Sequence, residues 1–295
     1  MNQANEMGKK IARTASFPLL LLGALLAGFY LREAGIEDTL ATLLVLGPVL
    51  AGLFVLERFI PYEREWNKNQ GDQTQDLIHF VALLALGGAT GALATGFVLF
   101  LGSHDLVALF RVWPREWPLP LQVGLALLAG DFIPYWIHRW SHEKGGFLWN
   151  VHSVHHAPAR LYFLNTARFH PLNIVWNVFF KNLPALLLGA EASVLYFASL
   201  ITLVHTFASH ANIDFRLGFL NWVFSMTELH RFHHSRDLQE ANSNYGGTLI
   251  LWDVVFGTRK LPARRIQADE IGFEIEPPDY PRTYAGQAAY PFRRG

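Results

Sequence analysis

The chain of 295 residues contains no cysteine, which excludes disulfide bonds and thiolate zinc sites. Charged residues are scarce, at 16% of the sequence, compared with roughly 25% in soluble domains. The 24 basic and 24 acidic side chains cancel. A nucleic-acid partner is therefore not expected, because binding to phosphates depends on an excess of positive charge. The sequence also lacks internal repeats and low-complexity tracts.

What the chain has instead is a large apolar fraction, 51% of its residues. Six apolar stretches approach the length of a helix that crosses a bilayer. We place these stretches at residues 14–31, 39–56, 77–101, 119–137, 172–190 and 193–209. Polar side chains interrupt the last two, namely Asn177, Lys181, Asn182 and His205. The sequence therefore predicts an integral membrane protein with several spans.

Six spans would place both termini on the same side of the membrane. Most basic residues then lie on that side, whereas the opposite loops carry only Arg32, Arg111 and Arg115. The positive-inside rule makes the basic side cytoplasmic. We interpret the first apolar stretch as a retained span rather than a signal peptide, because no small-residue cleavage site follows it. Since retention and retrieval signals are missing, we expect a bacterial inner membrane.

Eight of the thirteen histidines form three clusters with helical spacing, HRWSH, HSVHH and HRFHH. Their members are His138, His142, His152, His155, His156, His230, His233 and His234. Spacings of three and four residues place side chains on one face of a helix, and imidazole binds iron, zinc, copper and nickel. One zinc ion takes three or four protein ligands, so eight histidines indicate two metal ions. We predict an all-α fold, an integral membrane helical bundle with a cytoplasmic histidine-rich di-metal cap.

Further candidates lie close to these clusters. We expect His210, at the cytoplasmic end of the sixth span, to be an additional metal ligand. Asp131 lies within the fourth span, seven residues before His138, where an unpaired carboxylate is costly. We expect Asp131 to support catalysis by accepting a hydrogen bond from a ligand imidazole; the alternative is a packing hydrogen bond to a tyrosine or tryptophan. The sequence does not decide whether His170 and His205 touch the metals.

The combined motifs resemble the fatty acid hydroxylase/sterol desaturase superfamily. The resemblance extends beyond the histidines to DFIPYWIHRWSH at 131–142, RFHP at 168–171, SHANI at 209–213, LNWVFSMTELHRFHHS at 220–235 and NYGGTLILWDVVFGT at 244–258. In that family the histidines of these motifs hold two metal ions, understood to be iron, which activate O2 to attack unactivated C–H bonds of lipids. The eight clustered histidines match the family motifs position by position.

The resemblance implies a membrane-bound di-iron oxygenase that hydroxylates or desaturates a fatty acyl, sterol-like or alkylglycerol lipid. Two iron ions are the implied cofactor, and zinc is a possible substitute in purified protein. The reaction needs O2 and two electrons, and the chain has no haem, flavin or Rossmann fingerprint. We therefore expect a separate electron donor of the cytochrome b5, ferredoxin or flavin type.

Two functions from other classes remain open at this stage. A histidine-rich membrane metal transporter would hold its ligands near the middle of the bilayer, whereas these clusters lie at the ends of spans. A zinc-dependent membrane hydrolase would carry the order HExxH, which HRWSHE lacks. We divide the chain into N-terminal transmembrane helices and a linker (1–75), a fatty acid hydroxylase-like catalytic domain (76–260) and a cytoplasmic tail (261–295). After residue 258 we expect little regular structure.

Overall fold

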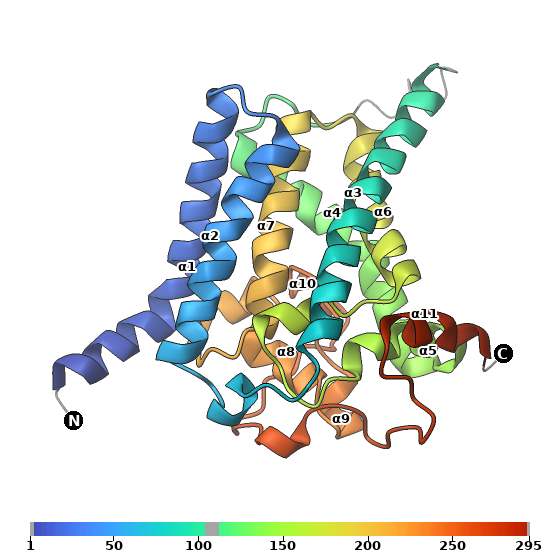
Figure 1. The fold of residues 1–295 in the computed structure, drawn as a ribbon. Coiled ribbons are helices and arrows are strands. Elements are labelled where there is room, and N and C mark those ends of the chain that lie inside the picture. The colour runs from blue at the N-terminus through green and yellow to red at the C-terminus, as the bar shows by residue number, and fades with distance from the viewer. Residues whose placement is uncertain (1–2, 104–111, 294–295) are drawn as a thin grey trace.

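A computed structural model describes residues 3–103 and 112–293, and within these ranges the chain is helical without a β-strand. Six helices lie side by side and run alternately from one end of the bundle to the other (Figure 1). These helices are α1 (Gln3–Glu33), α2 (Asp38–Phe59), α3 (Gln73–Ser103), α4 (Leu119–Lys144), α6 (Pro171–Leu188) and α7 (Ala192–His210). The predicted all-α helical bundle is confirmed.

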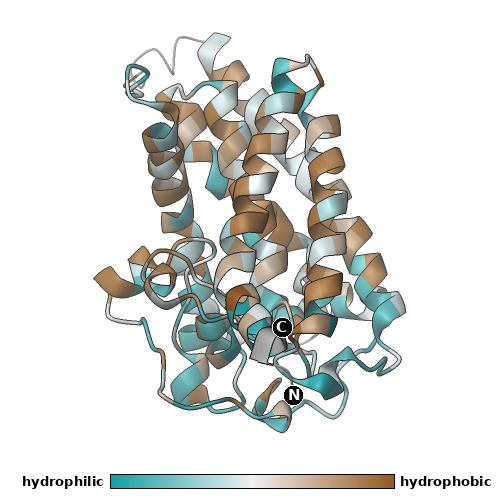
Figure 2. Cartoon of the chain, turned by 90° about the vertical axis from the view of Figure 1, so that its left-hand side faces the viewer, coloured by the Kyte–Doolittle hydropathy of each residue, from teal (hydrophilic) through white to brown (hydrophobic). Residues whose placement is uncertain are grey.

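Five of these helices, α1, α2, α3, α4 and α7, are long and apolar enough to cross a membrane. Figure 2 shows that apolar residues dominate the bundle and polar residues dominate the end where both termini lie. The fifth expected span, residues 172–190, corresponds to α6, which is not among the five. Its polar residues Asn177, Lys181 and Asn182 lower its hydropathy. Helix α6 packs against α3 and α4, so its polar side chains can face the protein interior.

A cap of short helices covers the end of the bundle that carries the termini (Figure 1). It consists of η1 (Arg64–Asn67), α5 (Gly146–His156), η3 (Phe163–Ala167), η4 (Gly218–Trp222), α8 (Thr227–His233), α9 (Leu238–Ala241), α10 (Leu251–Val255), η5 (Ala268–Glu270) and α11 (Tyr284–Arg293). Helix α4 continues from the bundle into this cap. It ends at Lys144, and the following Gly145 and Gly146 have φ values of 66° and 61°, which favour glycine. This sharp turn brings α5 back towards α4.

The expectation of little regular structure after residue 258 is wrong for the last part of the chain. Helix α11 packs against α5 and α3, and Gln287 on it is buried. The side chain of Gln287 lies 2.9 Å from Nε2 of His79, and the amide of Tyr284 donates to Gln75 at 2.8 Å. Tyr290 of this helix is buried against Tyr280, with ring centroids 4.8 Å apart, although the prolines in this part of the chain are typical of loops.

Candidate metal centre

Nine histidine side chains meet where α4, α5, α7 and α8 converge in the cap. They form two groups, in each of which the candidate ligand atoms lie within 4.8 Å of one another. The first group is His138, His142, His152, His156 and His233, and the second is His155, His210, His230 and His234. The structure therefore brings together all nine histidines that the sequence suggested as ligands.

Helical geometry explains why each HxxHH motif serves both groups. On α5, His152 and His156 are four residues apart and share one face, whereas His155 belongs to the second group. At α8 the assignment is reversed, since only His233 belongs to the first group. Each of the two motifs thus contributes two rings to one group and one ring to the other.

The backbone fixes which ring nitrogen carries the hydrogen in two members of the first group. Nδ1 of His138 donates to the carbonyl of Tyr245 at 2.7 Å, and Nδ1 of His233 donates to the carbonyl of Ser243 at 2.8 Å. A carbonyl oxygen can only accept, so Nε2 of each neutral ring carries a lone pair. The two Nε2 atoms are 2.9 Å apart. Neither can donate to the other, and this arrangement fits two ligands of one cation.

The second group shows the same arrangement. Nδ1 of His210 donates to Oδ1 of Asn165 at 3.2 Å, which leaves the lone pair on Nε2. This Nε2 lies 3.1 Å from Nε2 of His155, which in turn lies 3.2 Å from Nε2 of His234. His230 completes the group, with its Nε2 3.1 Å from that of His234. The four nitrogens converge on one small volume.

The separations between these nitrogens fit an ion with more than four ligands. The five closest pairs of Nε2 atoms are 2.9 to 3.2 Å apart. Nitrogens bound at about 2.1 Å lie about 3.0 Å apart at right angles and about 3.4 Å apart in a tetrahedron. The observed distances match right angles, and the five histidines of the first group exceed a tetrahedral zinc site.

Burial keeps the rings of the cap neutral. It lowers the pKa well below the usual histidine value, and neighbouring imidazoles lower it further because two positive rings would repel. This applies to His152, His155, His156, His230, His233 and His234. Neutral imidazole is the form that binds metal ions, so the cap presents its histidines in the competent form.

Asp131 differs from the sequence-based expectation because it contacts neither a ligand imidazole nor an aromatic hydroxyl. One carboxylate oxygen pairs with Nζ of Lys181 on α6 at 2.6 Å. The other oxygen accepts hydrogen bonds from the amides of Thr248 and Leu249, at 3.1 and 2.7 Å. Seven residues of helix span about 10.5 Å, so the short aspartate side chain does not reach the imidazole of His138. Asp131 instead ties α4 and α6 to the segment that follows the third cluster.

His170 and His205 lie outside both groups. His170 caps α6, since its Nδ1 accepts from the amide of Leu172 at 3.0 Å and its Nε2 lies 2.9 Å from the carbonyl of Ala288. His205 is buried within the bundle, and neither of its ring nitrogens makes a hydrogen bond with the described residues.

Sequence reasoning missed two asparagines that hold the imidazoles. Asn165 accepts from His210, as described above, and Oδ1 of Asn173 lies 3.0 Å from Nδ1 of His152. Both asparagines are buried. They flank the RFHP motif in the sequence, and this proximity was the available signal. Because partners of ligand histidines tune metal affinity, these asparagines belong to the functional site.

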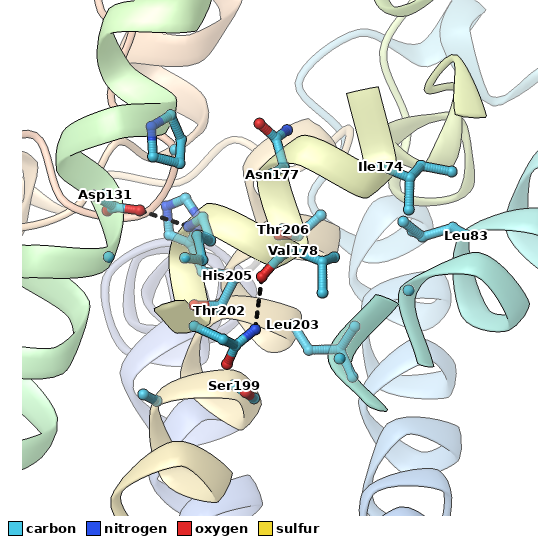
Figure 3. A pocket seen from close by; sticks show the side chains of 18 of the residues that line it. Leu83, Asp131, Ile174, Asn177, Val178, Ser199, Thr202, Leu203, His205 and Thr206 are labelled. Atoms are coloured by element: carbon cyan, nitrogen blue, oxygen red, sulfur yellow. Dashed lines mark hydrogen bonds and ion pairs between the residues drawn. The ribbon is translucent and has the colours of Figure 1, made fainter. Parts of the chain in front are cut away.

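A cavity of about 680 Å³ leads from the histidines into the bundle between α3, α4, α6 and α7. Ligand candidates from both groups line its cap end, among them His138, His155 and His210. Figure 3 shows Asp131 and His205 among the lining residues, together with side chains of α6 and α7. Most of the wall is apolar. The cavity has the size and lining that suit an organic molecule with a large apolar part.

Comparison with known proteins identifies the family. The sequence model described as fatty acid hydroxylase matches residues 123–258. An ornithine lipid hydroxylase of Rhizobium tropici is 33% identical over 283 residues, which cover 94% of this chain and 83% of that protein. The chain belongs to the fatty acid hydroxylase family. It is an oxidoreductase of this family and a membrane enzyme that hydroxylates lipids.

More distant members of the family match a little more than half of this chain. Human alkylglycerol monooxygenase is 31% identical over 167 residues, 54% of this chain and 37% of that protein. Methylsterol monooxygenase 2-2 of Arabidopsis thaliana is 28% identical over 188 residues, 58% of this chain and 70% of that protein. No solved structure gives a significant match. These three relatives are named as hydroxylases or monooxygenases, each of a different lipid.

Proposed function

We propose that the two histidine groups bind two iron ions, and that the enzyme uses O2 and two external electrons to hydroxylate a C–H bond of a membrane lipid. The observation that carries this proposal is the arrangement of His138 and His233. Their Nδ1 atoms donate to backbone carbonyls, so each Nε2 atom carries a lone pair, and the two Nε2 atoms lie 2.9 Å apart. An ornithine lipid is the first substrate to test, because the relative that matches along most of both chains is an ornithine lipid hydroxylase.

The proposed reaction requires a reductant that supplies two electrons. One C–H bond becomes C–O–H, one O2 is consumed, and two electrons with two protons reduce the second oxygen atom to water. When bound, the iron pair supplies the oxidising power that this bond requires, since an unactivated C–H bond has no acidity for general-base catalysis. The electrons come from a separate protein of the cytochrome b5, ferredoxin or flavin type.

The residues of the chain contribute positioning and exclusion of water. The carbonyls of Ser243 and Tyr245 and the amides of Asn165 and Asn173 hold four imidazoles in the tautomer that leaves Nε2 free. All nine candidate ligands lie at the cap end of the bundle, and most of them are buried. The cavity beside them has room for part of a lipid.

We further propose that the histidine end faces the cytoplasm of a bacterium, with the protein in the inner membrane. Basic residues support this orientation, since Arg58, Arg64 and Lys144 lie at the histidine end, whereas few lie at the opposite end. The division into membrane helices and linker (1–75), catalytic domain (76–260) and cytoplasmic tail (261–295) belongs to the same proposal.

The first test is the metal content of full-length protein that is produced with added iron and purified without chelators. We expect two iron ions per chain, and an ornithine lipid that gains one oxygen atom when O2 and a reductant are supplied. One tightly bound zinc ion and no iron, even after anaerobic reconstitution with ferrous ions, would contradict the proposal and favour a zinc hydrolase.

A further inference from the structure

The cavity carries a band of polar groups about two helical turns from the histidines. Asp131 and Lys181 form their ion pair there, and His205 and Asn177 line the same part of the wall (Figure 3). Charged and polar groups at this depth of a membrane protein are costly and usually mark a functional site. The band is separate from the nine candidate metal ligands.

Lys181 is accessible from the cavity although α6 packs between α3 and α4. Its side chain is 19% exposed and lines the cavity. The ammonium group has three hydrogens, of which one faces Asp131 and one is donated to Oγ1 of Thr248 at 2.7 Å. The third hydrogen is available to an anionic group in the cavity.

Unsatisfied polar atoms gather on the same wall. Neither ring nitrogen of His205 nor the hydroxyl of Ser225 has a hydrogen-bond partner among the described residues, and both side chains line the cavity. His205 is 1% exposed and lies beside the backbone of Ser225 without a hydrogen bond of ordinary geometry. Buried polar groups almost always have partners. This cluster therefore indicates a ligand that donates and accepts hydrogen bonds.

The charges of the band select the class of ligand. Asp131 and Lys181 are neutral as a pair, so a ligand with a net charge would leave one charge uncompensated within the bundle, which is strongly unfavourable. A zwitterionic group avoids this cost. Its anionic part would accept from Lys181, and its ammonium part would donate to the ring of His205 and to the amide oxygen of Asn177, which all line the cavity.

The rest of the ligand must be apolar, because the cavity also meets α2 and α3. Leu43 of α2 lines it, as do Leu83 and Leu84 of α3, and Leu43 is half exposed. Helix α3 packs against α6 and η3 rather than against α2. At Gly88 and Gly91 of α3, both in the cavity wall, an added Cβ would meet no atom within 4 Å. Acyl chains can therefore leave sideways between α2 and α3 into the bilayer.

We propose that the polar band binds the zwitterionic headgroup of an amphipathic membrane lipid, with Lys181, His205 and Asn177 as its specificity-determining residues. The acyl chains of the lipid pass between α2 and α3. This inference rests on the proposed function and names the class of its substrate.

The test measures binding to the full-length, iron-loaded protein by native mass spectrometry in detergent. Four lipids with matched acyl chains are compared: ornithine lipid and phosphatidylethanolamine, which are zwitterionic, phosphatidylglycerol, which is anionic, and diacylglycerol, which is uncharged. We expect the zwitterionic lipids to bind at least tenfold more tightly. Lys181→Gln and His205→Phe should each remove this preference, whereas Lys144→Gln, an exposed lysine at the end of α4, should retain it.

Equal affinity of the parent for all four lipids would overturn the inference, as would an unchanged preference in His205→Phe. If Lys181→Gln loses iron because its contact with Thr248 weakens, His205→Phe decides alone, since the ring makes no hydrogen bond whose loss would disturb the fold. The measurement detects lipid binding and does not require turnover of the lipid. If the enzyme oxygenates lipids but binds zwitterionic lipids no more tightly than the others, only this inference is contradicted. If it prefers zwitterionic lipids but oxygenates none of them, only the proposed function is contradicted.

Discussion

At the scale of single residues, the site depends on where each imidazole carries its hydrogen. In His138 and His233 a backbone carbonyl holds the hydrogen on Nδ1, and in His210 a side-chain amide does so. The free lone pairs then converge within each group. Without an ion, neighbouring lone pairs repel, so metal binding should both fill the site and stabilise the cap.

The two groups should lose metal independently. His155→Ala removes a ring from the second group only, and His233→Ala removes one from the first group only. We expect each variant to retain about one iron ion per chain instead of two, and to lose at least 100-fold in turnover, because the proposed reaction needs both ions. Metal analysis by mass spectrometry and a lipid oxygenation assay provide the two readouts.

His170→Asn is the matched control for these histidine variants. His170 caps α6 outside both groups, and asparagine also caps helices well. The control should keep two iron ions. Full metal content and activity in His155→Ala would show that this histidine is not a ligand.

The asparagines that orient the rings should tune metal affinity. Asn173→Leu removes the partner of Nδ1 of His152, so the ring can turn or change tautomer. We expect iron affinity to fall by about 10- to 100-fold, measured by competition with a chelator, while Asn173→Asp should retain the affinity of the parent. An affinity unchanged in Asn173→Leu would remove this residue from the functional site.

The sequence supports prediction of single residues only where the contacts are local. Helical spacing within eleven residues of α5 was enough to suggest His152, His155 and His156, which lie together as expected. The partner of His152 is 21 residues away, and the partner of His210 is 45 residues away. Such contacts depend on how helices cross, which spacing does not determine. For the same reason, the ion pair of Asp131 was not predicted.

At the scale of elements, two helices behave differently from simple membrane spans. Helix α6 is polar for a span because its side chains face the cavity and Asp131 of α4. Helix α3 carries glycines at 87, 88, 91 and 96, a pattern that is typical of close packing against a neighbouring helix. Only at Gly87 would an added Cβ approach a neighbour, Val178 of α6, at 3.9 Å. The pattern of small residues is the same for a packed seam and for a cavity wall, so the sequence could not distinguish them.

A bulky side chain in the wall of α3 should therefore obstruct the lipid without disturbing the metals. Gly88→Phe places a ring between α2 and α3, where an added Cβ meets open space. We expect at least tenfold lower turnover of a bilayer lipid with iron content unchanged. Gly96→Phe is the control, since Gly96 also has open space but does not line the cavity. Equal losses in both variants would indicate a general effect on α3 rather than obstruction.

At the scale of the whole molecule, an apolar bundle carries a polar cap (Figure 2), where the nine candidate ligands lie. Periodicity predicted this division because the histidine clusters follow the ends of apolar stretches. The helix α11 was not predicted, since its stability depends on contacts with α5 and α3 that join distant parts of the chain. The side of the membrane that the cap faces follows from charge alone and needs a direct measurement.

The orientation of the cap can be measured by thiol labelling, because the chain has no cysteine and a single introduced thiol is then its only one. Glu65→Cys places it at the cap end in η1, where the Glu65 side chain is 61% exposed, and Glu116→Cys places it in the exposed loop before α4 at the opposite end. A membrane-impermeant maleimide should label Glu116→Cys in intact spheroplasts and Glu65→Cys only after lysis. Lipid oxygenation in each variant verifies the fold. The reverse labelling pattern would place the cap outside the cytoplasm, and the electron donor would then have to be sought on that side.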